Sequence, residues 1–131
     1  MESFSIATRS RTDLVDVTER VAEVLRRAGG RTGAVLVYIP HTTAGVTINE
    51  NADPSVRADI LLALKKMVPD SLPYEHSEGN SPAHIKAGLV GSSVMVMVEH
   101  GRLNLGTWQG IYFCEFDGPR RRKVWVRLLP S

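Results

Sequence analysis

The chain has 131 residues, of which 43% are hydrophobic and 23% are charged. This length predicts a single domain over residues 1–131, and the composition excludes a disordered tail protein or a collagen-like repeat. Sixteen basic and fourteen acidic residues leave a formal net charge of +2, which is too balanced for a general nucleic-acid binder.

The first elements in the chain are a strand and a helix. Residues 4–8 alternate between apolar and small or polar side chains, which predicts a strand with one buried face. A helix is expected to follow Asp16, which can cap it, with Glu19 completing a capping box. Apolar residues recur at helical spacing over residues 17–28, and two glycines at 29–30 end the pattern.

Two further strands and a second helix are predicted next. Residues 34–39 form a continuous apolar run, which indicates a strand buried on both faces, and residues 46–48 form another strand. Asp53 is a predicted helix cap, with Pro54 at the first helical position. The core stripe of this helix is expected to comprise Val56, Ile60, Leu61, Leu64, Met67 and Val68.

A long irregular segment precedes the last elements. Residues 69–83 carry three prolines and a glycine, and loops of this length tend to be functional or mobile. A short helix capped by Ser81 is expected through Leu89. Strands are then predicted at 94–99, 108–116 and 123–129. Strands grouped in this way predict an α+β fold, a mostly antiparallel β-sandwich with two longer helices and one short helix.

Three histidines are candidate metal ligands. His41 ends a buried strand, His76 lies in the long loop, and His84 begins the short helix. The spacing alone is weak evidence, because a hydrogen-bonded loop histidine would look the same. The carboxylates and the amide nearby, including Glu78 and Asn80, strengthen it, since imidazole and carboxylate groups together suit a divalent ion.

Glu115 is the most informative acidic residue. It lies in the otherwise apolar run 111–116, on the same predicted face as Ile111 and Phe113. A carboxylate in apolar surroundings is costly unless it is paired, and burial would raise its pKa and suit it to proton transfer. An edge position, or pairing with an arginine such as Arg120 or Arg127, is the structural alternative.

Other polar residues could contact a ligand. Thr42 and Thr43 follow His41 at a strand end and could donate hydroxyl hydrogen bonds, although they could equally be strand-favouring residues at a turn. The glycine-flanked segment 106–110 could approach a ligand closely, or simply form a turn. The basic run 120–123 is the one local charge excess, and it could be either a solvated strand end or a phosphate clamp centred on Arg120.

An ordered set of short motifs is similar to the YjbQ-like family, which is described as a secondary thiamine-phosphate synthase family. The similarity extends from about residue 4 to residue 129. The motifs are His41-Thr42-Thr43-Ala44, Asn49-Glu50-Asn51-Ala52-Asp53-Pro54, Glu78-Gly79-Asn80, His84-Ile85-Lys86, Gly101-Arg102-Leu103, Leu105-Gly106-Thr107-Trp108-Gln109 and Glu115-Phe116-Asp117-Gly118-Pro119-Arg120.

The resemblance implies an antiparallel β-sandwich, a homotrimer with pockets near subunit boundaries, and a weak thiamine-phosphate synthase activity. It further implies catalytic roles for Glu115 and His41, and a divalent ion (zinc, magnesium or manganese) held by His41, His76 and His84. The candidate residues for binding a phosphorylated substrate are Thr42, Thr43, Asn80, Lys86, Arg102, Thr107, Gln109 and Arg120.

Three functional hypotheses stay open at this point. The first is an enzyme that acts on a small phosphorylated metabolite with thiamine-phosphate synthase-type activity. The second is a metal-assisted hydrolase that uses the same residues, and the third is a non-catalytic trimeric binding module. We expect no nucleic-acid partner, and no membrane partner, because no apolar run approaches the roughly 18 residues of a membrane span. The lone Cys114 and the absence of a signal-peptide pattern predict a cytoplasmic protein.

Overall fold

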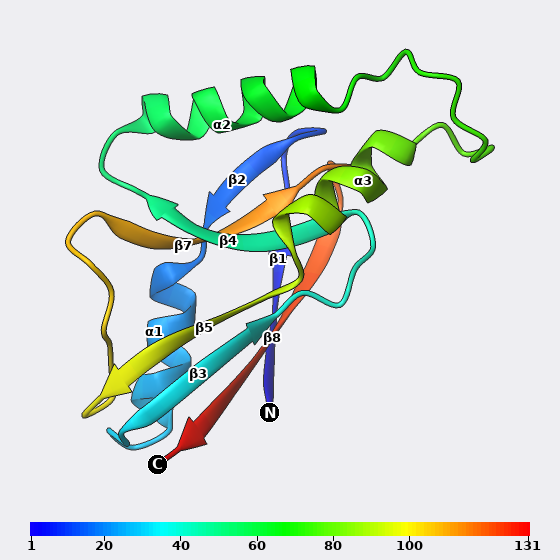
Figure 1. Cartoon of the computed structure of the whole chain (residues 1–131). Coiled ribbons are helices and arrows are strands. Elements are labelled where there is room, and N and C mark those ends of the chain that lie inside the picture. Colours follow the sequence, from blue (N-terminus) through cyan, green and yellow to red (C-terminus); the bar gives the residue numbers. More distant parts are fainter.

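The computed structural model describes residues 1–131 as eight strands and three helices (Figure 1). The five-stranded sheet has the order β1 (Glu2–Ala7), β8 (Arg121–Pro130), β3 (Gly33–Tyr38), β5 (Ser93–Glu99) and β6 (Arg102–Leu103). The three-stranded sheet has the order β2 (Asp13–Asp16), β7 (Gln109–Glu115) and β4 (Ala44–Glu50). The helices are α1 (Thr18–Arg27), α2 (Pro54–Met67) and α3 (Ser81–Val90). All strand pairings are antiparallel, which confirms the predicted α+β fold.

Two apolar clusters hold the layers together. The larger one lies between the inner faces of the two sheets and α1, and it includes Val21, Val37 and Phe113. The smaller one lies between the other face of the three-stranded sheet and the helices α2 and α3, and it includes Leu14 and Phe116. The three-stranded sheet is therefore the middle layer, with the five-stranded sheet on one side and α2 and α3 on the other (Figure 1).

Strand β7 runs through the middle of this arrangement, and its side chains alternate between the two clusters. Ile111 and Phe113 point into the larger cluster, whereas Tyr112 and Cys114 point into the smaller one. The period of two along a strand predicts this alternation, and the structure confirms it. Burial raises the pKa of the Cys114 thiol to about 12, so this thiol is an inert core group.

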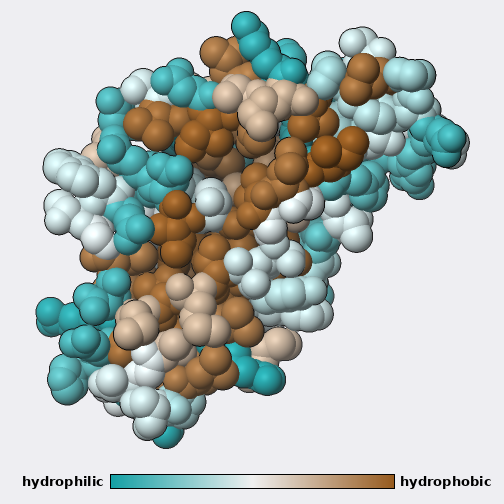
Figure 2. Space-filling model, viewed as in Figure 1, coloured by the Kyte–Doolittle hydropathy of each residue, from teal (hydrophilic) through white to brown (hydrophobic).

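One face of the five-stranded sheet is not covered within the chain. Val35 and Val37 are buried, but the alternate residues of β3 point outward, so the prediction that residues 34–39 are buried on both faces is wrong. The apolar residues on this outer face are Leu36, Tyr38, Met95, Met97, Trp125 and Leu129. Figure 2 shows hydrophobic atoms gathered over the middle of the molecule, where β3 and β5 lie in Figure 1.

The helix starts differ in how well the sequence predicts them. Asp53 caps α2 as expected, because its Oδ1 accepts a hydrogen bond from the Ser55 amide at 2.9 Å. Asp16 accepts from the amide and the hydroxyl of Thr18, but Glu19 pairs with Arg26 on the surface, so the predicted capping box is absent. Ser81 is the first residue of α3 rather than its cap.

Helix α2 is more exposed than its apolar pattern predicts. Ile60, Leu61 and Leu64 pack partly against the smaller cluster, and Val68 is buried, but Met67 exposes 68% of its surface. The sequence also gives no clear signal for β2 and β6, which have four and two residues. None of the three helices has the length and apolar character that crossing a membrane requires.

Candidate functional site

The candidate site is built over a buried ion pair between Glu115, the last residue of β7, and Arg122, the second residue of β8. Nε of Arg122 donates to both carboxylate oxygens, at 2.9 and 3.2 Å, and Nη2 donates to Oε2. Glu115 exposes 0% of its surface and Arg122 exposes 2%. Two charges removed from water need such bidentate geometry to offset their lost hydration.

Two more donors complete the surroundings of the Glu115 carboxylate. The hydroxyl of Thr8 donates to Oε1 at 2.7 Å, and the amide of Asp117 donates to Oε2 at 3.1 Å. Burial alone would raise the pKa of Glu115, but the hydrogen bonds from Arg122, Thr8 and Asp117 outweigh burial and lower it. The geometry therefore makes Glu115 an ionised structural group, paired with Arg122 rather than with Arg120 or Arg127.

Arg122 also orients the segment after β3. Its Nη2 donates to the hydroxyl of Thr43 at 2.9 Å and to the Thr43 carbonyl at 3.3 Å. Thr43 exposes only 5% of its surface, so its side chain is part of this buried network. The guanidinium that pairs with Glu115 therefore also fixes the loop that carries His41 and Thr42.

His41 is held by the main chain of β8. Its Nε2 accepts a hydrogen bond from the Lys123 amide, with 2.9 Å between the two nitrogens. An accepting nitrogen carries no proton, so the neutral ring has its hydrogen on Nδ1. Burial lowers the pKa of His41, and the positive charge of Arg122 lowers it further. The imidazole is therefore a neutral group whose Nδ1–H is free to donate.

A pocket of about 560 Å³ opens beside this network. It contains four of the residues predicted from the sequence, namely His41, Thr42, Thr43 and Arg120. The complete lining is Tyr38, Ile39, Pro40, His41, Thr42, Thr43, Ser92, Arg120, Arg122 and Trp125. We call this the His41 pocket. It brings hydroxyl, imidazole and guanidinium groups together, and no carboxylate lines it.

Asp117 links the His41 pocket to α3. Nε of Arg120 donates to the carbonyl of Asp117, and Nη2 donates to its carboxylate, each at 3.0 Å. The amide nitrogen of Asn80 donates to the same carboxylate at 2.9 Å, while its Oδ1 is buried without a partner. Asn80 is therefore next to the pocket through Asp117 but does not line it.

The three predicted metal ligands do not form a metal site within the chain. His76 and His84 lie edge to face, with 5.3 Å between their ring centroids. However, no group of three or more histidine, cysteine, aspartate or glutamate side chains is arranged to hold an ion. His41 moreover uses Nε2 for the Lys123 amide. Within one chain, His41, His76 and His84 therefore do not come together as a site for zinc, magnesium or manganese.

Besides Asn80, four predicted substrate residues lie outside the His41 pocket. Lys86 lines a separate cavity, and Arg102 lies at the β5–β6 hairpin beside His100. Thr107 is exposed before β7, and Oε1 of Gln109 accepts from the Gly106 amide at 2.8 Å. Gln109 and Glu115 are the two ends of β7, about 20 Å apart at the rise of an antiparallel strand. One chain therefore does not bring this segment to the His41 pocket.

The comparison with known families decides the identity of the chain. The sequence profile described as "UPF0047 protein YjbQ-like" matches residues 2–131. The chain belongs to this family. The resemblance inferred from the short motifs is thus confirmed over almost the whole length.

Several members of the YjbQ-like family are similar to this chain along their whole length. UPF0047 protein MJ1081 of Methanocaldococcus jannaschii is 48% identical over 126 residues, which are 96% of this chain and 91% of that protein. UPF0047 protein YugU of Bacillus subtilis is 48% identical over 130 residues, 98% of each chain. The crystal structure of a YjbQ/UPF0047-family protein from Clostridium acetobutylicum has a TM-score of 0.96 and 51% identity, and it covers 98% of this chain and 100% of its own.

These findings correct the predicted function. The relatives are named only as YjbQ-like or UPF0047 proteins, and none of these names mentions thiamine-phosphate synthesis. The metal ion on which the prediction depended has no three-residue site in the chain. The prediction of a thiamine-phosphate synthase-type enzyme with a His-lined metal centre is therefore wrong, and the metal-assisted hydrolase has no metal site within one chain to support it.

Sequence reasoning missed the central residue of the YjbQ-like site. Arg122 lies in the basic run 120–123, for which the sequence indicates a solvated strand end or a phosphate clamp. Val124 and Val126 fall at alternate positions of the strand expected at 123–129, so they share one face. Extending that alternation backward by two residues places Arg122 on the same face, where an arginine needs a buried anion. Ser92, Tyr38 and Trp125 also line the pocket, and the sequence gives no signal for them.

Proposed function

We propose that this chain binds a small phosphorylated molecule in the His41 pocket. The observation that carries the proposal is the lining of that pocket, which combines His41, Thr42, Ser92 and Arg120 with no carboxylate. Phosphate oxygens are acceptors only, so a lining rich in donors and free of carboxylates suits them. Its volume of about 560 Å³ lies within the range of small-molecule sites.

The charge balance of the pocket favours a ligand of low charge. Arg122 is already paired with Glu115, and Arg120 is paired with Asp117. The two guanidinium groups therefore add little net positive charge to the pocket, and they act mainly as hydrogen-bond donors with a fixed orientation. The side chain of Arg120 is 49% exposed, so some of its guanidinium N–H groups can donate to a ligand. The neutral His41 can donate from Nδ1. A phosphate monoester fits this set better than a pyrophosphate, which would need further cations.

The expected homotrimer is also a proposal, and the uncovered face of the five-stranded sheet supports it. Met95 and Met97 expose 57% and 66% of their surfaces on this face, and exposed patches of large apolar residues mark interaction surfaces. Tyr38 and Trp125 stack there with 5.7 Å between centroids and also line the His41 pocket. A second copy packed on this face would therefore cover one side of the pocket. Light scattering of the wild type and of a Met95→Glu/Met97→Glu variant tests this, and a wild-type monomer contradicts it.

Calorimetric titration with inorganic phosphate and methyl phosphate tests the binding proposal. We expect Arg120→Gln to weaken binding by about tenfold or more, because a hydrogen bond to a charged group is lost. Arg121→Gln is the matched control, since Arg121 lies in the same basic run but is exposed and outside the pocket. Equal affinities for the wild type and Arg120→Gln, or equal losses in the two variants, would contradict the proposal.

A further inference from the structure

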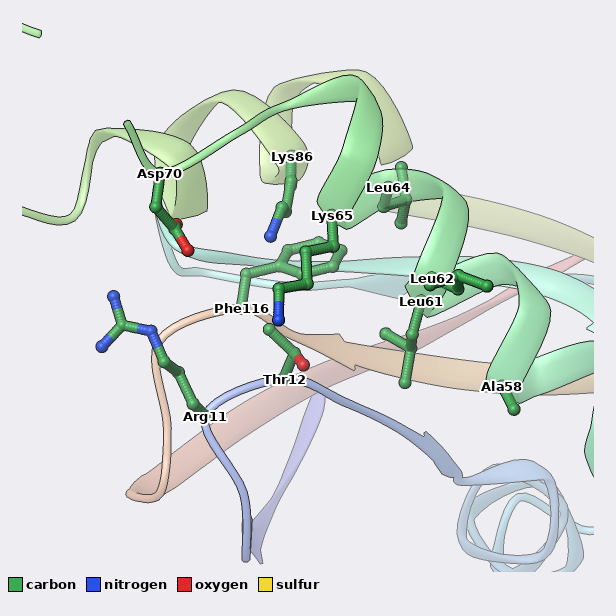
Figure 3. A pocket seen from close by; sticks show the side chains of 10 residues that line it. All are labelled: Arg11, Thr12, Ala58, Leu61, Leu62, Leu64, Lys65, Asp70, Lys86 and Phe116. Atoms are coloured by element: carbon green, nitrogen blue, oxygen red, sulfur yellow. The ribbon is translucent and has the colours of Figure 1, made fainter. Parts of the chain in front are cut away.

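A second cavity lies on the other side of the three-stranded sheet, beneath α2 (Figure 3). Its volume is about 460 Å³, and it shares no lining residue with the His41 pocket. Its walls come from α2, from α3 and from the segment before β2. The lining residues are Arg11, Thr12, Ala58, Leu61, Leu62, Leu64, Lys65, Asp70, Lys86 and Phe116. We call this the Lys86 cavity.

The Lys86 ammonium is the unusual feature of this cavity. The residue exposes only 5% of its surface and makes no ion pair within the chain, but its Nζ is not fully buried and keeps access to solvent through the cavity. Figure 3 shows its amine pointing into the cavity above the ring of Phe116. An ammonium that has lost much of its hydration and has no counter-charge gains from pairing with an anion. The chain supplies this cation but not the anion that would pair with it.

The charges around Lys86 make this imbalance larger. Arg11, Lys65 and Lys86 contribute three positive charges to the lining, and Asp70 contributes the one negative charge. Burial lowers the pKa of Lys86, the Asp70 carboxylate raises it, and Arg11 and Lys65 lower it further. Asp70 thus lies close enough to act on the ammonium but makes no ion pair with it. The cavity keeps an excess of positive charge.

The rest of the lining is apolar. Phe116 exposes 2% of its surface, and Leu61, Leu62 and Leu64 of α2 also line the cavity. Half of the ten lining residues are hydrophobic. A ligand for this cavity must therefore combine one anionic group with a compact apolar body. A highly charged molecule would lose its hydration against the apolar side chains without regaining polar contacts.

We infer that the Lys86 cavity is a second binding site, distinct from the His41 pocket, for a small organic monocarboxylate with an aliphatic or aromatic body. The carboxylate pairs with Lys86 and is reached by Lys65 or Arg11. The apolar body lies against Phe116 and the leucines of α2. This arrangement gives the Lys86 ammonium an anionic partner and removes the apolar walls from water.

A three-ligand panel tests this inference on the unmodified protein. Hexanoate, hexanol and hexylammonium share one apolar body and differ in charge, and NMR titration gives the affinity of each. We expect hexanoate to bind with shifts at Lys86 and Phe116, hexanol to bind about tenfold more weakly or worse, and hexylammonium not to bind. Equal binding of hexanoate and hexanol, or shifts elsewhere only, would overturn the inference.

Two variants locate the binding. Lys86→Met keeps the length and removes the charge, and we expect about a tenfold loss of hexanoate affinity. Lys66→Met is the matched control on α2, because Lys66 does not line the cavity. Arg11→Gln provides an exposed alternative if Lys86→Met folds poorly. Arg120→Gln, which tests the His41 pocket, should leave the affinity for hexanoate unchanged. The proposals for the two sites can therefore be contradicted independently.

Discussion

The Glu115 carboxylate and the Arg122 guanidinium join two sheets that share no backbone ladder. Glu115 ends β7 in the three-stranded sheet, and Arg122 begins β8 in the five-stranded sheet. The same guanidinium holds Thr43, so the position of the His41 loop depends on this ion pair. A buried pair of this kind is weak evidence of net stabilisation, but loss of one partner leaves an uncompensated charge.

Replacing Arg122 with methionine tests this dependence. The change leaves the fully buried Glu115 carboxylate without its partner, and we expect the free energy of unfolding to fall by about 3–5 kcal/mol. Arg27→Met removes an arginine from exposed pairs with Glu2 and Glu23, and it should leave the free energy of unfolding nearly unchanged. Urea denaturation measures both values, and similar losses in the two variants would contradict the assigned role.

A double variant separates charge from packing. Glu115→Leu combined with Arg122→Met removes both charges and keeps apolar volume, so most of the stability lost in Arg122→Met should return. If the double variant is less stable than Arg122→Met, the pair stabilises the fold through more than mutual neutralisation. The double-mutant cycle gives the coupling energy directly.

The lowered pKa of Glu115 predicts an acid-dependent loss of stability. The native state holds this carboxylate ionised at a pH where the unfolded chain, with an ordinary pKa of about 4.3, begins to take up a proton. Its contribution is complete above that value and is lost as the pH falls through the lower native pKa. Urea titrations between about pH 3 and 6 should show a flatter slope for Glu115→Gln than for the wild type. Parallel slopes would contradict the pKa direction.

NMR titration of His41 tests the geometry at the pocket directly. The ring should stay neutral below its ordinary pKa of about 6.5, with the hydrogen on Nδ1, because Nε2 accepts from the Lys123 amide. The unfolded chain takes up this proton first, so acidification through that range weakens the native state. Nitrogen-15 shifts report the tautomer, and a pKa above 6.5 or a hydrogen on Nε2 is the opposite result.

Gly118 tests how tightly the network is packed. A Cβ at this position would lie 2.3 Å from the Ser10 carbonyl oxygen and 2.8 Å from Cγ of Glu115. We expect Gly118→Ala to destabilise the fold by about 1–3 kcal/mol. Gly88 in α3 has open space, so Gly88→Ala should instead stabilise by about 0.5–1 kcal/mol. Thermal unfolding compares the two, and a tolerated Gly118→Ala would show that the loop gives way.

The sequence predicts the fold well where local physics decides it. Periodicity finds all three helices and the six longer strands, and cap chemistry places the start of α2 at Pro54. It fails where tertiary contacts decide. Strand β2 has only four residues, Leu14 and Val15 between two aspartates, and it forms by pairing with the edge of β7. The outer face of β3 is uncovered although its sequence is apolar, since side-chain chemistry alone does not show what lies opposite.

Only part of the site is predictable from the sequence, again because tertiary contacts decide the rest. The motif around His41 and the carboxylate of Glu115 are recognisable because a polar group beside an apolar run needs an explanation. Their relation is not recognisable, because it depends on Arg122 arriving from another sheet. The three histidines resemble a ligand set in the sequence, but the fold brings only His76 and His84 together. Catalysis itself stays a prediction.

A crystal structure of the protein with methyl phosphate decides whether the His41 pocket binds a phosphate group. We expect the phosphate in the His41 pocket, within hydrogen-bond distance of His41 Nδ1, the Thr42 hydroxyl and the Arg120 guanidinium. Density for the phosphate only at other positions, with the His41 pocket filled by water, would contradict it.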